Sequence, residues 1–335
     1  MKNQRISLAH GDGGELAHNL IQDVFVQAFG HNDQARFDSA IIDAPSARLA
    51  VTTDSFVVKP IFFPGGNIGK IAIAGTVNDL AVSGAVPMYL TAAFIIEEGF
   101  KINDLKEIVR TMASEAEKAN VRVIAGDTKV VERGSIDGLY INTTGVGFVD
   151  PDRTVNPEHI ETGDSIIISG TIGDHGVAIL GARGELGIKS DVNSDCAALN
   201  GLIDSILKNV DGVRIMRDPT RGGLATTLVE IAEDFQVTME IVEEQIPIQK
   251  QVQGACDILG YDPLYLANEG KVIIIVKKEN EAKVLELLKQ HELGRDARVI
   301  GHITGKGKGH LHLKTGLGST RRLNRLSGMM LPRIC

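Results

Sequence analysis

The chain has 335 residues, and its 35 basic and 43 acidic side chains give a net charge of −8. This balance argues against a nucleic-acid binder that works through overall charge, and the 43% hydrophobic content excludes long disorder and a collagen-like structure. Since domains usually span about 100 to 200 residues, the length predicts two of them.

The sequence shows no sign of secretion or of membrane insertion. It contains no apolar run of the roughly 18 residues that a membrane span needs, and its first residues lack the apolar core of a signal peptide. Its three cysteines, Cys196, Cys256 and Cys335, are too scattered for a disulfide framework. We therefore expect a cytoplasmic protein that contacts neither membrane nor nucleic acid.

The first half of the chain alternates helical and strand patterns. Apolar residues at helical spacing follow a Gly-rich opening and predict a helix over 16–28. The patterns after it predict, in chain order, a strand over 48–53, a small-residue helix over 68–83, a strand over 88–96, a helix from Asn103 to 116, and strands over 121–125 and 139–149. Residues 149–164 hold two prolines and many turn formers, which indicates a domain boundary there.

The second half repeats the mixture. The patterns predict strands over 165–169, 236–243, 271–276, 297–303 and 309–313, and helices over 196–208, 223–234 and 279–290. The fold class is therefore α/β (α+β), with an N-terminal domain over 1–155 and a C-terminal domain over 156–314.

The last residues have a different composition. Gly, Ser and four arginines replace the alternating pattern, so we expect 315–335 to be a flexible tail. Pro332 disfavours a helix at Leu331, and an extended strip can enter a cleft. Cys335 would then be the most reachable thiol, either a frayed end or a swinging carrier of a covalently bound group.

Several aspartates stand beside Gly, Thr or Asn at the ends of apolar elements. Asp54, Asp79, Asp127 and Asp218 are of this kind, and a carboxylate fixed by a sheet is a natural Mg²⁺ ligand. Each could instead cap a helix or close a turn. Asp79 resists that explanation because it lies in the apolar segment IAGTVNDLAVSGA, where an unpaired carboxylate is costly.

Two Gly-rich segments precede predicted helices. His10-Gly11-Asp12-Gly13-Gly14 and Phe63-Pro64-Gly65-Gly66-Asn67-Ile68-Gly69-Lys70 could bind phosphates at a helix N-terminus, or be plain turns. Neither is a Walker motif.

Other polar residues lie at strand and helix ends. Lys129 follows Gly-Asp-Thr and Glu269 precedes a strand, so the two could orient and deprotonate an amide, or be a solvated pair. His175 is either a site residue or a neighbour of a helix cap. His310 and His312 alternate on one strand without further ligands nearby, which indicates surface residues rather than a metal site.

Taken together, these segments resemble the HypE family of hydrogenase maturation factors, in the PurM-like ATP-dependent superfamily. The resemblance is carried by HGDGG, TTDSFVV, FFPGGNIGK, NDLAVSGA, GDTKVV, SGTIGDHG, RDPTRGG, ANEGK and the ending PRIC, in register along the whole chain. It implies a two-domain PurM-like fold whose N-terminal domain forms the interface of a homodimer.

The resemblance also implies a reaction. The carbamoyltransferase HypF places a carbamoyl group on the terminal cysteine, here Cys335, and HypE uses ATP to dehydrate it to a thiocyanate. The cyanide then passes to iron held by the HypC–HypD complex, for the active site of [NiFe]-hydrogenase.

The site residues follow from the same motifs. The metal candidates, for Mg²⁺, are Asp54, Asp79 and Asp218. The catalytic candidates are Cys335, Lys129, Glu269 and His175, and which of Lys129 and Glu269 is the base stays open. The candidates for ATP binding are Gly11, Gly13, Gly14, Lys70, Asn78, Asp127, Thr128, Arg221, Gly222 and Gly223.

Two alternatives remain at this point. The first is another PurM-like enzyme, such as a selenophosphate synthetase or a thiamine-phosphate kinase. The N-terminal loop lacks the reactive Cys of the former, and neither explains Cys335. The second is a scaffold that docks maturation partners without catalysis, against which the aspartates and the Lys129/Glu269 pair argue.

Overall fold

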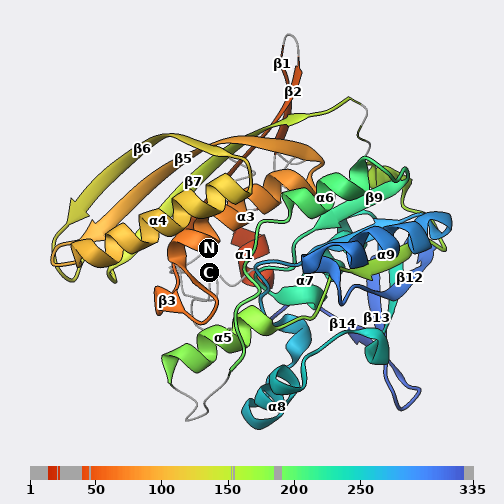
Figure 1. The fold of residues 1–335 in the computed structure, drawn as a ribbon. Coiled ribbons are helices and arrows are strands. Elements are labelled where there is room, and N and C mark those ends of the chain that lie inside the picture. Colours follow the sequence, from red (N-terminus) through yellow and green to blue (C-terminus); the bar gives the residue numbers. More distant parts are fainter. Residues whose placement is uncertain are drawn as a thin grey trace.

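The computed structural model describes residues 14–20, 22, 40–44, 47–151, 153, 155–184 and 191–327, and these form two α/β parts (Figure 1). Within these ranges the N-terminal part contains a five-stranded sheet in the order β1-β2-β7-β5-β6, in which β5 and β6 run parallel and the other neighbours antiparallel. The strands are β1 (Ala40–Ala44), β2 (Ala47–Phe56), β5 (Ala85–Glu97), β6 (Arg122–Val131) and β7 (Leu139–Val149), with a small hairpin of β3 (Phe62–Phe63) and β4 (Gly66–Asn67).

One face of this sheet is covered by helices α3 and α4 (Figure 1). The N-terminal helices are α1 (Glu15–Leu20), α3 (Ile68–Val82) and α4 (Ile102–Lys118). The side chain of Asn67 caps α3 by accepting from the N–H groups of Gly69 and Lys70. Nearly every side chain of α3 is buried, since the helix lies against the sheet, α4 and the C-terminal part at once.

The C-terminal part is built on a seven-stranded sheet of the described residues, in the order β14-β13-β10-β12-β8-β11-β9. Its strands are β8 (Ser165–Ile168), β9 (Val213–Arg217), β10 (Val237–Val242), β11 (Ile273–Val276), β12 (Arg298–Lys306), β13 (His310–Lys314) and β14 (Thr320–Leu323). Its helices are α5 (Asp174–Arg183), α6 (Asn200–Leu207), α7 (Gly223–Asp234), α8 (Lys250–Leu259) and α9 (Glu281–Gln290). The interior strands β8 and β11 are fully buried, as their isoleucine runs require.

The predicted α/β class is confirmed, and most predicted elements are present. The sequence patterns missed β1, the β3–β4 hairpin, α5, α8, β9 and β14, and the predicted helix over 196–208 begins only at Asn200. Of the predicted helix over 16–28, residues 16–20 lie in α1, and 21 and 23–28 lie outside the described residues. No helix in the described part of the chain is long and apolar enough to cross a membrane.

The flexible tail was predicted to begin too early. Residues 320–323 form β14, which pairs antiparallel with β13. Leu323 and Leu326 are buried, and Arg321 and Arg325 bind acidic partners, so the arginines that suggested a solvated tail instead hold this stretch to the domain. Residues 328–335, which include Cys335, lie outside the described residues.

Candidate functional site

Several charged residues of the described chain lie around Glu269, in the loop between α8 and β11. Glu269 is only 3% exposed, and its Oε1 atom has no hydrogen-bond partner among the described atoms. Burial raises the pKa of Glu269 well above its usual value, and the nearby carboxylates of Asp218, Asp195 and Asp54 raise it further, while Arg221 opposes them. A carboxylate in such surroundings is a strong base once it has lost its proton.

Asp54 and Asp218 reach this point from different domains. Asp54 lies on β2, where burial raises its pKa and the charge of Arg221 opposes the shift. Asp218 is buried directly after β9 and, of the neighbouring carboxylates, has the largest effect on the pKa of Glu269. The structure thus brings together two of the three predicted metal candidates and Glu269, one of the two candidates for the base.

The donor set fits a divalent cation. Clustered carboxylates at a domain junction repel one another, and oxygen ligands of this kind are those that Mg²⁺ prefers. Among the described residues, no three His, Cys, Asp or Glu side chains already converge in a group that could hold a metal. An Mg²⁺ bound here would therefore share its shell with phosphate and water oxygens, as is usual for a magnesium–nucleotide complex.

Asp79 lies beside this cluster, at the last turn of α3. Thr52 Oγ1, on β2, donates a 2.8 Å hydrogen bond to Asp79 Oδ2. On the same face of the β2–α3 interface, Asp54 Oδ2 lies close to the position that a Cβ on Gly75 would take, at 3.8 Å. The third metal candidate therefore shares an interface with Asp54.

The loop before α7 requires its two glycines. Gly222 and Gly223 have φ values of +78° and +63°, and a Cβ on Gly223 would lie 2.6 Å from the carbonyl oxygens of Leu264 and Leu266. This tight turn follows Asp218 and presents the exposed Arg221 next to Asp54 and Glu269. Phosphate binding by Arg221 and these two glycines stays a prediction.

The two other predicted nucleotide segments are only partly described. Gly11 and Gly13 lie outside the described residues, whereas Gly14 is buried, and a Cβ there would lie 2.1 Å from the Leu326 carbonyl oxygen. Lys70, in the first turn of α3, donates to the Gly65 carbonyl oxygen at 3.0 Å. Lys70 also lines a groove of about 780 Å³ between the domains, with Glu115, Asp195, Cys196, Lys271 and Arg295 among its walls.

Asn78 makes hydrogen bonds between the two domains. Its Nδ2 group donates to the carbonyl oxygens of Ala197 and Glu269 at 3.1 and 3.5 Å, and its Oδ1 accepts from the Leu199 N–H at 2.7 Å. Because these bonds reach the C-terminal part and the residue is 1% exposed, Asn78 joins the two domains, and its contact with a nucleotide stays a prediction.

His175, a predicted catalytic candidate, is enclosed by the protein. The ring is fully buried in α5, its Nδ1 lies 2.8 Å from Ser194 Oγ, and its edge packs against Phe63. In the described chain His175 therefore belongs to the packing of α5, and its catalytic role stays a prediction.

Asp127, Thr128 and Lys129 lie on β6, the exposed edge strand of the N-terminal sheet. Lys129 Nζ pairs with Asp127 Oδ2 at 3.2 Å, which lowers the pKa of the Asp127 carboxyl. The charged residues that act on Glu269 belong to other segments, so the described single chain does not bring Lys129 to Glu269.

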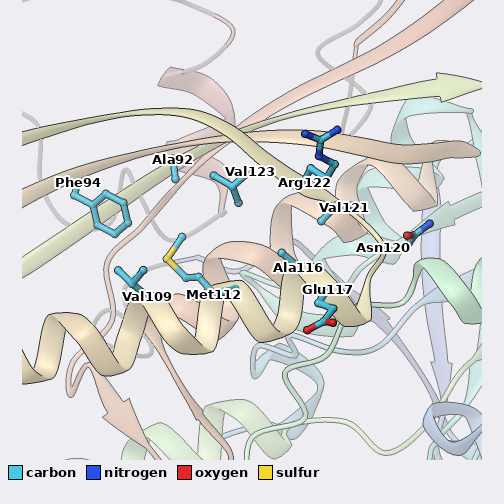
Figure 2. Close-up of a pocket in the computed structure, with 11 residues that line it drawn as sticks. Ala92, Phe94, Val109, Met112, Ala116, Glu117, Asn120, Val121, Arg122 and Val123 are labelled. Atoms are coloured by element: carbon cyan, nitrogen blue, oxygen red, sulfur yellow. The ribbon is translucent and has the colours of Figure 1, made fainter.

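The surroundings of β6 are unusually open and apolar. A cavity of about 620 Å³ lies between α4 and the strands β5 and β6, where Val109 and Met112 of α4 point toward Phe94 and Val123 (Figure 2). Ile124 and Val130 on the same strand are 56% and 69% exposed. Exposed apolar side chains on an unpaired edge strand indicate an interaction surface.

The sequence analysis missed two residues, Asn268 and Asp195, whose hydrogen bonds fix the loop that carries Glu269. Asn268 accepts from the Gly173 N–H and donates to the Pro219 carbonyl oxygen, and Asp195 accepts from the N–H groups of Glu269 and Gly270. Asn268 was visible within the ANEGK segment, but its partners are distant in the chain. Asp195 belongs to none of the recognised segments.

Comparison with known proteins places the chain among AIR synthase-related proteins. The model of the family's N-terminal domain matches residues 36–149, and that of its C-terminal domain matches residues 161–314. A protein of Rhodobacter capsulatus named carbamoyl dehydratase HypE is 47% identical over 338 residues, covering 100% of this chain and 99% of that protein. The protein of the same name from Escherichia coli is 44% identical over 336 residues, covering 98% and 99%.

Solved structures agree. HypE in a complex with HypF superposes with a TM-score of 0.86 at 46% identity, covering 92% of this chain and 99% of that one. HypE in complex with ATP gives 0.83 at 42% identity, covering 99% and 100%. A thiamine monophosphate kinase from Aquifex aeolicus, at 18% identity and a TM-score of 0.67, shares the fold alone.

Proposed function

The chain belongs to the HypE family, and on that premise we propose that it is an ATP-dependent carbamoyl dehydratase of [NiFe]-hydrogenase maturation. In this proposal the S-carbamoyl group on its own Cys335 loses the elements of water and becomes a thiocyanate. The observation that carries the proposal is the buried Glu269 carboxylate with an unpartnered Oε1, facing charges from both domains.

The reaction needs the amide oxygen to become a good leaving group. Attack of that oxygen on the γ-phosphorus of ATP forms a new P–O bond and breaks the bond to ADP. Removal of the two N–H protons then builds the carbon–nitrogen triple bond as the C–O bond breaks and phosphate leaves. ATP and the thiocarboxamide thus yield ADP, phosphate and the thiocyanate.

Different residues of this chain remove the proton and bind the phosphates. Glu269, raised in basicity by burial and by its acidic neighbours, takes an N–H proton. Arg221 and the Gly222-Gly223 turn hold phosphate oxygens, together with the N-terminal glycines Gly11, Gly13 and Gly14. The buried backbone of Glu269 and the tight Gly222-Gly223 turn hold these groups in place, which favours a reactive orientation.

Mg²⁺ would be held by Asp54, Asp218 and Asp79. When bound, it neutralises charge on the phosphates that ATP brings. The fit rests on the donor set, since Asp54 and Asp218 share the electrostatic surroundings of Glu269.

The proposed active form is a homodimer, in which a second copy of the chain contacts β6. The open apolar surface at β6 suits a homodimer, in which the edge strand and its exposed Ile124 and Val130 are covered. Asp127, Thr128 and Lys129 lie on that strand, so dimer formation gives these candidates an environment that the single chain lacks. There Asp127 and Thr128 would contact the nucleotide and Lys129 would orient the amide.

Two further partners belong to the proposal. HypF donates the carbamoyl group to Cys335, and a HypE relative has been solved in complex with HypF. The HypC–HypD complex accepts the cyanide. The segment up to Leu326 is anchored to the domain, so residues 327–335 would deliver Cys335 to these partners and to the site.

An isotope experiment tests the chemistry. The protein carrying an S-carbamoyl group labelled with ¹⁸O is mixed with MgATP. Mass spectrometry then measures the ¹⁸O content of the released phosphate. The proposal expects one ¹⁸O atom in each phosphate, because the amide oxygen attacks phosphorus. Unlabelled phosphate together with a thiocyanate would overturn the phosphorylation route.

A further inference from the structure

The Asp195 carboxylate binds three consecutive residues of the loop that carries Glu269. Its Oδ1 accepts the Glu269 N–H at 3.2 Å, and its Oδ2 accepts the Gly270 N–H at 3.2 Å. The Nζ atom of Lys271 lies 3.4 Å from the same Oδ2, and the Asp195 side chain is 2% exposed. One buried carboxylate thus fixes the backbone on which Glu269 stands.

A further backbone hydrogen bond joins the two loops, and here the segment of Asp195 is the donor. The Ala197 N–H donates to the Glu269 carbonyl oxygen at 3.3 Å, two residues beyond Asp195. A Cβ at Gly270 would lie 1.9 Å from the Asp195 carbonyl oxygen, so the two backbones approach as closely as glycine alone permits. The loop before α6 and the loop before β11 therefore form one rigid unit.

The other side of Glu269 is fixed as well. Asn268 Oδ1 accepts the Gly173 N–H at 2.7 Å, and Asn268 Nδ2 donates to the Pro219 carbonyl oxygen at 2.9 Å. With its backbone held on both sides, Glu269 keeps freedom in its side chain alone.

We propose that Asp195 is a positioning residue for the dehydration step, whose carboxylate fixes the Glu269 backbone so that the Glu269 side chain meets the substrate amide. This inference rests on the proposed function. A carboxylate is required because two neighbouring N–H groups need two acceptor oxygens at once. An amide in its place would turn an NH₂ group toward a backbone N–H.

The test compares Asp195→Asn, Glu269→Gln and the double variant. Each protein is carbamoylated by HypF, and single-turnover dehydration of the Cys335 adduct is followed by mass spectrometry at several MgATP concentrations. Asp164→Asn is the matched control. Asp164 is another buried carboxylate of the same domain that accepts a backbone N–H, from Glu161, and pairs with an arginine, Arg214.

The positioning role predicts a specific pattern. Dehydration by Asp195→Asn falls by about ten- to a hundredfold, since small misplacements of a reacting group cost rates of this order. Its half-saturating ATP concentration and its carbamoylation by HypF stay within about threefold of wild type. The double variant is no slower than Glu269→Gln within about twofold, because Asp195 acts through Glu269. Asp164→Asn dehydrates at the wild-type rate.

Other outcomes overturn the proposal. If Glu269→Gln is slow and Asp195→Asn is as fast as wild type, Asp195 does not position the base. If the double variant is much slower than Glu269→Gln, Asp195 acts by another route. Should Asp195→Asn fail to fold, Asp195→Ser replaces it with the same expected pattern, since a hydroxyl brings no NH₂ group against the backbone. Wild-type activity in Glu269→Gln would instead refute the proposed base.

Discussion

Thr52 on β2 donates a 2.8 Å hydrogen bond to Asp79 at the end of α3, which ties the metal candidate in the helix to the strand that carries Asp54. The bond joins residues 27 positions apart in the chain. It gives Asp79 a fixed orientation in a segment where most side chains are buried and apolar.

The Asp79 carboxylate is expected to be needed for magnesium-dependent turnover. Asp79→Asn keeps the shape and the bond from Thr52 but removes the charge, so ATP turnover should fall by about tenfold or more. ADP release over a range of Mg²⁺ concentrations measures this. Asp257→Asn, at a residue bonded to Gln253 on α8, is the control. A folded Asp79→Asn protein with unchanged turnover would contradict the metal assignment.

Asn78 is expected to matter for stability. Asn78→Ala leaves the buried partners at Ala197 and Leu199 unsatisfied, which should lower the free energy of unfolding by about 1–3 kcal/mol. Urea unfolding without nucleotide measures the change, and Asn209→Ala, at an exposed helix end, should leave the midpoint in place. A wild-type midpoint for Asn78→Ala would contradict the role at the domain junction.

Arg325 is expected to anchor the base of the C-terminal segment. Its Nε lies 2.7 Å from a Glu233 carboxylate oxygen and its Nη1 3.5 Å from Glu230, and the next residue, Leu326, donates to Thr226 Oγ1. In Arg325→Ala a longer stretch is released, so the effective concentration of Cys335 at the site falls and dehydration should slow by about two- to threefold.

Mass spectrometry of the Cys335 peptide measures that rate, and Arg325→Lys should recover most of it because the ion pairs are kept. Arg322→Ala, at an exposed residue of the same segment, is the control. Equal rates in Arg325→Ala and wild type would show that the anchor does not set the delivery of Cys335.

The homodimer proposed above makes β6 an interface. Ile124→Asp places a charge on its exposed apolar surface, and burying that charge is costly, so the variant should be monomeric. Sedimentation velocity measures the mass in solution. Ile258→Asp, at a 71% exposed residue on α8, should leave the assembly unchanged. A wild type that is itself monomeric, or a dimeric Ile124→Asp, would refute this interface.

The sequence predicted those helices and strands whose burial shows in their own hydrophobic pattern. The isoleucine runs of β8 and β11 and the amphipathic α4 follow from their own periodicity. The cost of an unpaired carboxylate at Asp79 was also visible, although its partner Thr52 was not. β14 was missed because Leu323 is buried by pairing with β13 and not by any pattern within the tail.

The site was harder to predict because it depends on contacts between domains. Glu269 stood out from its place before a strand, but the support from Asp195 is invisible without the fold. Asn78 and His175 belong to recognisable segments, and sequence alone does not distinguish a ligand-binding amide or imidazole from one bonded inside the protein.

The measurement that tests the central claim most directly is the mass of the peptide containing Cys335. The protein is incubated with HypF, carbamoyl phosphate and MgATP, and a parallel sample receives a non-hydrolysable ATP analogue. We predict a carbamoyl adduct on Cys335 in both samples once HypF has acted, and loss of one water from it only with hydrolysable ATP. An adduct that keeps its water under both conditions would leave a carrier without dehydratase activity and contradict the account.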